Sequence, residues 1–319
     1  MKNNKFIKIT IMIVLLFSLT GCTKYMKDEK KQIIKNNTTG QNLPINILCK
    51  PTDSTTINIY NEYNKTTKNK KVELEKLSDC KTMPIKSNAY DGLWTTIFVQ
   101  PLAWLIIKIG NLVKSYGLSI ILCTLLIRSI VFPLTKKTAM QSENMKKAQN
   151  KINKVEKKYA NRQDTASMQQ KAQELQLVYK EYDINPFASC LVMFIQVPLF
   201  FAFYEAITRI PAIFEDKFLG LNLGTSPNVG LLQQGNILYL ILIVLVIFAT
   251  YFSFKFNMRD LQNEEQAKQM KSMTYFMVIM MSITAFSISS GIAIYWITSN
   301  LFTIIQNILV KRSVKNGRN

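Results

Sequence analysis

Long apolar runs alternate with charged segments along most of the chain, and the lengths of these runs set the first expectation. A helix needs about 20 apolar residues to cross the roughly 30 Å hydrocarbon core of a bilayer. The last run, Met273–Val310, contains no charged residue. As one helix it would be about 57 Å long, so we expect it to fold back at Ser287–Gly291. The pattern predicts five spans: Gly117–Leu134, Phe187–Glu205, Ile237–Phe254 and the two halves of the last run.

A further apolar segment, Leu93–Val113, is interrupted by polar residues at helical spacing. Its apolar residues recur every three or four positions, and its polar residues share the opposite side, a pattern typical of an amphipathic helix. We therefore expect residues 92–114 to form a helix that lies in the outer membrane interface rather than a sixth span. The apolar side has Trp94, Phe98, Leu102, Leu105, Ile109 and Leu112, and the polar side has Thr96, Gln100, Lys108, Asn111 and Ser115.

Between the first two spans, residues 136–183 carry two amphipathic patterns separated by a turn signal at 160–164. Apolar residues at alternating spacings of three and four predict two antiparallel helices that share a narrow seam. Asp164 or Thr165 is the expected N-cap of the second helix. The two halves of the seam are Met145, Ala148, Ile152, Val155 and Tyr159 in the first helix, and Met168, Ala172, Leu175 and Tyr179 in the second.

The N-terminus has the layout of a bacterial lipoprotein signal. Three lysines precede the apolar run Ile9–Leu19, which ends in Leu19-Thr20-Gly21-Cys22. This run is too short to span a bilayer, and the tetrapeptide is similar to a lipobox, in which the cysteine thiol accepts a diacylglycerol. We expect residues 1–21 to be a signal peptide and Cys22 to be lipidated outside the cytoplasm. The alternative is an ordinary anchor helix with a chance cysteine.

Residues 22–91 are rich in Lys, Asn and Thr and contain few large apolar residues. They are expected to form either a mobile tether or a small, poorly cored module on the extracytoplasmic side. Three short pieces, 45–48, 56–60 and 72–77, have the composition of strands. Cys49 and Cys80 would face an oxidising compartment, where they could form a disulfide or remain two thiols.

With the N-terminus outside and five spans, segments 136–183 and 255–271 and the tail 313–319 are cytoplasmic. These segments are rich in Lys and Arg, whereas in loop 208–235 two basic residues are offset by two acidic ones. That asymmetry satisfies the positive-inside rule. The sequence thus predicts an all-α, multi-pass protein of a bacterial cell membrane, with a five-span core over residues 115–312.

Composition narrows the function classes. The 319 residues are 48% hydrophobic and carry a formal net charge of +20, which fits a membrane protein with basic flanks. The sequence contains no compact basic module interleaved with aromatic residues, so we do not expect it to bind DNA. The chain has no histidine, no C-x-x-C pair among its five cysteines and no phosphate-binding loop. We therefore expect no enzyme activity, no metal site and no cofactor.

Arg128 is the most informative residue, because it lies eight residues before Lys136 inside a helix that is otherwise apolar apart from Thr124 and Ser129. That spacing places it about 12 Å deep along the helix axis. Such a charge normally faces a polar or hydrated interior, although it could also extend its side chain toward the cytoplasm. Other predicted spans also carry polar residues, and each of these alone would suit helix packing. Together with Arg128 they predict a hydrated groove. They are Gln196, Ser299, Asn300, Thr303 and Gln306.

Three motifs resemble those of the YidC/Oxa/Alb family of membrane-protein insertases. They are Tyr116-Gly117-Leu118-Ser119-Ile120 leading to Arg128 and Pro133-Leu134, then Asn185-Pro186-Phe187 with Gln196-Val197-Pro198, and Ser290-Gly291 through Tyr295-Trp296 to Asn300-Leu301-Phe302. The resemblance covers roughly residues 91–312. It departs at Ser289 and Val278, where prolines are expected, so the last helical hairpin is expected to bend differently.

The resemblance implies an insertase core with an outer interfacial helix, a cytoplasmic helical hairpin and a groove around Arg128. It implies nascent membrane proteins as clients, with the Sec translocon and the ribosome as partners. Two other interpretations stay open. One is a transporter or channel for a small anion, with Arg128 as the counter-charge, and the other is a scaffold lipoprotein that organises other membrane proteins.

Overall fold

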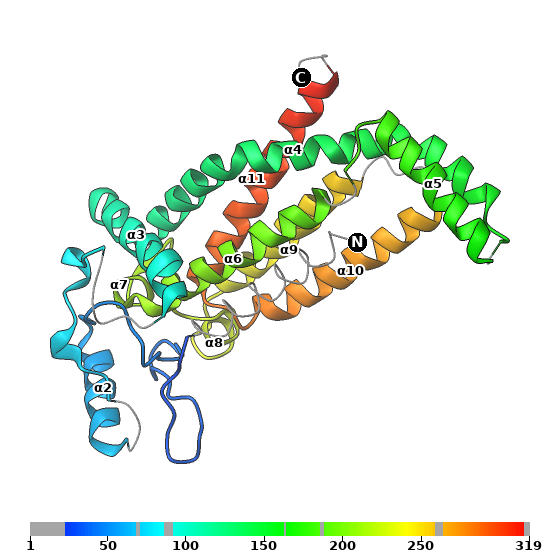
Figure 1. The fold of residues 1–319 in the computed structure, drawn as a ribbon. Helices are drawn as coiled ribbons and strands as arrows, with labels where there is room; N and C mark the ends of the chain where they lie inside the picture. Colours follow the sequence, from blue (N-terminus) through cyan, green and yellow to red (C-terminus); the bar gives the residue numbers. More distant parts are fainter. Residues whose placement is uncertain are drawn as a thin grey trace. The chain divides into compact units, whose positions relative to one another are not determined.

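The computed structural model describes residues 23–67, 71–85, 92–162, 164–185, 188–258 and 264–315. The described chain is mainly helical, as predicted (Figure 1). It divides into two compact units. The first contains Met1–Thr124, Leu199–Val244 and Thr284–Trp296, and the second contains Leu125–Pro198, Leu245–Ile283 and Ile297–Asn319. The expected signal peptide and Cys22 lie outside the described residues.

Five long helices correspond to the predicted spans: α4 (Tyr116–Lys158), α6 (Ala188–Arg209), α9 (Leu238–Met258), α10 (Glu264–Ala285) and α11 (Ser290–Lys315). Because α10 ends at Ala285 and α11 begins at Ser290, the last apolar run folds back close to the predicted position. Helix α4 continues for 43 residues through Pro133 and therefore carries both the first span and one arm of the hairpin.

Within the described residues, four helices are long and apolar enough to cross a membrane: Thr95–Val113, Tyr116–Lys158, Leu238–Lys255 and Ser290–Ser313. This finding rests on length and composition alone. Many side chains of α6 and α10 lie outside the described set, so the count of five spans stays a prediction. By the same measure, the segment predicted to lie in the interface is also apolar enough to span.

That segment forms a π-helical turn, Thr95–Val99, which continues into α3 (Gln100–Val113). Its packing differs from the expected amphipathic pattern at Gln100, which was placed on the polar face but is only 1% exposed. Phe98 and Leu112, on the expected apolar face, are exposed instead. Beside lipid, apolar side chains can lie on the outside, so periodicity does not tell which face packs inward.

Residues 23–83 form a small module with its own core rather than a tether. Its longest element is α2 (Ser54–Thr66), with the 3₁₀ turns Leu74–Lys76 and Cys80–Thr82 beyond it. A disulfide joins Cys49 to Cys80. The core contains Met26, Leu43, Ile47, Tyr60, Tyr63, Val72 and Leu74, together with Phe214 from the loop after α6.

The three strand predictions for this module were wrong. Residues 56–60 lie within α2, whose N-cap Asp53 accepts a hydrogen bond from the Thr56 amide at 2.8 Å. Thr56, Tyr60 and Tyr63 are the buried residues of that helix, at spacings of four and three. Residues 72–77 contain a 3₁₀ turn, and 45–48 form an irregular segment.

The loop after α6 contains α7 (Pro211–Phe214), a hairpin of β1 (Lys217–Phe218) and β2 (Leu221–Asn222), and α8 (Pro227–Leu232). Leu219 and Gly220 both have positive φ, as a two-residue hairpin turn of the I′ type requires. The ring of Phe218 lies so close to Gly117 at the start of α4 that a Cβ there would be 2.1 Å from Cγ. Gly117 is therefore needed for this contact.

The C-terminal part of α4 pairs with α5 (Thr165–Glu181). The predicted seam is confirmed for most of its first helix and for Leu175 and Tyr179. It was wrong at Met168 and Ala172, which are exposed, because the buried side of α5 is centred on Val178 instead. Asp164 is the N-cap of α5, and its carboxylate accepts a hydrogen bond from the Ser167 amide at 2.8 Å. Exposed ion pairs, Lys151–Glu181 and Lys158–Glu174, join the arms. The buried residues of the seam are Ala148, Ile152, Val178 and Ile184, with Met145, Val155, Leu175, Tyr179 and Tyr182 packed against them.

Candidate functional site

Arg128 lies where α4, α6 and α11 supply polar groups to one point. Its side chain is buried, with the residue only 8% exposed. The Nη2 group donates a hydrogen bond to Oε1 of Gln196 in α6 at 2.8 Å and another to Oγ of Ser299 in α11. One guanidinium group therefore cross-links three helices, and hydrogen bonds that involve a charged group are the stronger kind.

The contact between α4 and α11 continues along both helices in the same direction. Two turns after Arg128, the Thr135 hydroxyl donates to Oε1 of Gln306 at 3.2 Å. Between these polar contacts, Phe132 and Phe302 meet edge to face with ring centroids 6.4 Å apart. The seam is thus polar, aromatic and polar again, with a spacing of seven residues on each helix, which is characteristic of helices that pack side by side.

The other predicted groove residues have different surroundings. The Thr303 hydroxyl donates to the Ser299 carbonyl of its own helix at 3.0 Å, and Thr303 and Asn300 are half-buried. The opposite side of α11 exposes Leu301, Ile305 and Leu309, each about half exposed. Helix α11 therefore has one face that carries the polar seam and another that carries large apolar side chains.

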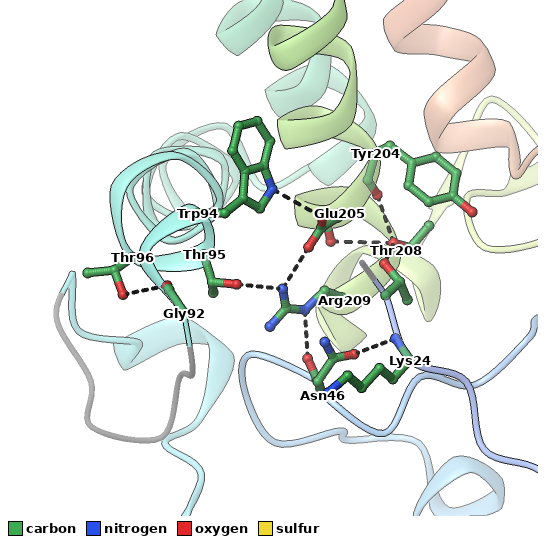
Figure 2. A network of polar contacts seen from close by, with 11 residues as sticks. Lys24, Asn46, Gly92, Trp94, Thr95, Thr96, Tyr204, Glu205, Thr208 and Arg209 are labelled. Carbon is green, nitrogen blue, oxygen red and sulfur yellow. Dashed lines mark hydrogen bonds and ion pairs between the residues drawn. The ribbon is translucent and has the colours of Figure 1, made fainter. Parts of the chain in front are cut away.

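A second polar cluster, at the end of α6, was not predicted. Glu205 and Arg209 form an ion pair, with Oε2 and Nη1 2.9 Å apart and both side chains at most 5% exposed. Glu205 accepts a hydrogen bond from the Trp94 indole at 3.1 Å, and Arg209 Nη1 donates to the Thr95 hydroxyl at 3.3 Å. Figure 2 shows these side chains converging, with the Nε of Arg209 directed to the Asn46 carbonyl.

The sequence had counted Arg209 among the charges of an external loop, but it is the last residue of α6 and is 2% exposed. An acidic and a basic residue four positions apart at the end of an apolar run is a signal that could have found this pair. Thr135 was also missed, although it lies on the Arg128 side of α4, seven residues later.

Comparison with known proteins gives independent information on about two thirds to three quarters of the chain. Residues 108–317 match the model of a family described as the 60Kd inner membrane protein. The chain is 34% identical over 239 residues to a protein of Oceanobacillus iheyensis named membrane protein insertase YidC, a match that covers 74% of this chain and 91% of the relative. It is also 34% identical over 219 residues to the membrane protein insertase MisCA of Bacillus subtilis, which covers 68% of this chain and 79% of that protein.

A solved structure, described as an active YidC insertase with the first transmembrane domain resolved, resembles the fold with a TM-score of 0.50. The sequence identity is 23%, and the match covers 70% of this chain and 47% of that one. The chain thus spans about half of the solved protein, and this likeness supports the fold alone.

Proposed function

The chain belongs to the YidC/Oxa/Alb family of membrane-protein insertases, and on that premise we propose that it moves hydrophobic segments of nascent proteins into the lipid bilayer. The observation that carries the proposal is the buried guanidinium of Arg128, which is bound by Gln196 and Ser299 from two other helices. An arginine at this depth costs at least about 2.5–3.5 kcal/mol on insertion scales, so its presence indicates a function.

In the proposed mechanism, the short hydrophilic end of a client enters a groove beside Arg128. The positive charge lowers the cost of moving acidic or polar groups out of water, because electrostatic attraction is stronger in a medium of low dielectric constant. Burial of the client's apolar surface in lipid supplies the driving force. No nucleotide, metal or catalytic group is needed for these steps.

The client's apolar segment would leave along α9 and α11. Helix α9 exposes a series of large apolar side chains that includes Leu240, Val244 and Phe248. Helix α11 exposes Leu301, Ile305 and Leu309 on the side away from its polar seam. The exposed apolar side chains of each helix support its proposed role as a surface along which the client meets lipid.

The proposed arrangement in the membrane has a lipid anchor at Cys22 and the module of residues 23–83 outside the cytoplasm. The helical hairpin would be cytoplasmic, where its many lysines could contact lipid head groups, a ribosome or the arriving client. The insertase would act alone or with the Sec translocon. Globomycin-sensitive processing of the precursor tests the anchor, and an uncleaved precursor in untreated cells would count against it.

The function is tested by complementation of insertase-depleted cells, scored by insertion of a single-span client with a charged N-terminal tail. We expect Arg128→Ala to reduce insertion by about tenfold or more, because it removes the charge, and Arg128→Lys to reduce it less. Arg162→Ala, at an exposed arginine of the hairpin turn, is the matched control. Wild-type insertion by both Arg128 variants would contradict the proposal.

Purified protein in proteoliposomes separates this function from its rivals. Insertion of the client without other proteins supports an insertase. Flux of a small anion without client insertion supports a transporter, and the absence of both supports a scaffold.

A further inference from the structure

The ion pair between Glu205 and Arg209 also binds several other groups, and charge neutralisation alone does not explain these contacts. Both side chains are almost fully buried. Taking two charges out of water is costly, and apolar residues of similar volume are often as stable in such a place. A buried pair that also binds several other groups is better explained by the arrangement that it specifies than by a gain in stability.

The groups bound by this pair come from two segments that are distant in the sequence (Figure 2). From the module, the Asn46 carbonyl accepts a hydrogen bond from Arg209 Nε at 2.7 Å, and the Leu48 amide donates to the Arg209 carbonyl at 2.9 Å. From the residues just before α3 come the Trp94 indole and the Thr95 hydroxyl. The last turn of α6 therefore binds both segments at once.

Apolar burial alone does not distinguish the faces of the helix that runs from Trp94 through α3, here called the α3 segment, so polar contacts can select between them. Ala103 and Ile106 face inward and are fully buried, but Ile97 and Leu112 on the outer side are equally apolar and are 53% and 82% exposed. Next to lipid there is little hydrophobic driving force to choose between such faces. Trp94 and Thr95, at most 6% exposed, are polar groups on the inner face that reach the ion pair.

We propose that Glu205 and Arg209 are positioning residues: their ion pair selects the face of the α3 segment that packs on the end of α6, and it fixes module residues 46–48 at the same point. The two donor directions of the guanidinium group make this double attachment possible. Nε serves the module while Nη1 serves Glu205 and Thr95.

Arg209→Lys tests this proposal, because lysine keeps the charge next to Glu205 but lacks the rigid fork that reaches both segments. The readout is hydrogen exchange of the full-length protein in lipid nanodiscs, resolved by peptide. We expect the amides of residues 46–48 and 94–99 to exchange about tenfold faster, since their attachment opens locally. Exchange around Arg128 in α4 and along the seam of α11 should be unchanged. Arg162→Lys, the same change at an exposed position, should leave every segment as in the wild type.

Wild-type exchange at both segments in Arg209→Lys would overturn the proposal, because the arginine would then only neutralise Glu205. Faster exchange along the whole chain would also overturn it, since the pair would then act through general stability. If Arg209→Lys does not accumulate, Glu205→Gln takes its place. That variant keeps an acceptor for Trp94 but removes the charge that holds Arg209, and the same local changes are expected.

The role of the pair in activity rests on the proposed insertase function and is measured separately. Arg209→Lys is expected to lower client insertion by about tenfold, because lysine keeps the charge but cannot make the hydrogen bonds of the guanidinium group to both segments. A variant that loosens both segments but inserts clients like the wild type would overturn this role. Failure of the wild-type protein to insert clients would instead reject the proposed function and leave the exchange result unaffected.

Discussion

At the scale of single residues, Arg128 shows what a charge inside an apolar helix requires. Counting back from Lys136 predicts that Arg128 lies about 12 Å deep along the helix, and that depth stays a prediction. The structure shows that the side chain is buried. Its partners were harder to predict. Ser299 and Gln196 were named as polar residues of other spans, but only the rotation of α6 and α11 about their axes brings them to the guanidinium group. That rotation depends on packing between helices, which local sequence patterns do not encode.

The structure separates predicted groove residues that bind Arg128 from one that does not. Gln196 accepts directly from the guanidinium group, whereas the Thr303 hydroxyl is bonded to its own helix. We expect Gln196→Leu to reduce client insertion by about tenfold, since the buried, charged side chain of Arg128 loses a hydrogen bond. Thr303→Val, which changes a hydroxyl that does not reach Arg128, should insert clients nearly as the wild type does. Equal losses in the two variants, measured by complementation, would show that this distinction is wrong.

At the scale of helices and strands, the sequence predicted best the helices that have a strong N-cap or a long stretch of regularly spaced apolar residues. The turn and N-cap of the hairpin were found because Asp164 follows a polar turn and precedes a regular seam. The strand predictions in the module failed because short segments such as 56–60 fit a strand or a helix equally well. The packing of α2 against the rest of the module resolves the ambiguity, since Tyr60 and Tyr63 must face one core.

The cap of α5 gives a prediction that depends on pH. Hydrogen bonds from Ser167 to the carboxylate lower the pKa of Asp164. A lowered pKa means that the charged form stabilises the folded state, so this contribution is present at neutral pH and is lost as pH falls through the folded-state pKa. We expect this loss in the wild type to begin as the pH falls below about 4, the unperturbed pKa of aspartate, and the first turn of α5 to fray fully only below the lowered folded-state pKa.

Asp164→Asn is the matched variant, because its side-chain oxygen can still accept from Ser167 but does not titrate. Its first turn should be equally protected at neutral and acidic pH, and Asp164→Ala should be frayed at both. Exchange of the Ser167 and Met168 amides, compared between the two pH values after correction for intrinsic rates, measures this. A pH dependence that persists in Asp164→Asn would assign it to another group.

At the scale of the whole molecule, the sequence predicted the order of the segments but not the attachment of the module. Residues 22–91 could be described only as a tether or a small module, because the contacts that decide between them join distant residues. Thr52 donates from its amide and its hydroxyl to the Glu215 carboxylate, and Phe214 completes the core of the module. These partners are about half the chain apart, and no local pattern connects them.

The disulfide between Cys49 and Cys80 closes a loop with a sequence separation of 31 residues, beside the point where Leu48 meets Arg209. In the chain-entropy model, a loop of this length stabilises the folded module by about 3–4 kcal/mol. We expect the double variant Cys49→Ser and Cys80→Ser to lower the opening free energy of the slowest-exchanging amides of α2 by about this amount. Exchange along α11 near Ser299 should not change, because that part of α11 lies in the other compact unit.

Cys123→Ser, at a buried free cysteine of α4, controls for the loss of a thiol and should leave α2 as protected as in the wild type. Unchanged exchange of α2 in the double variant would mean that the contacts to Phe214, Glu215 and Arg209 hold the module together without the disulfide.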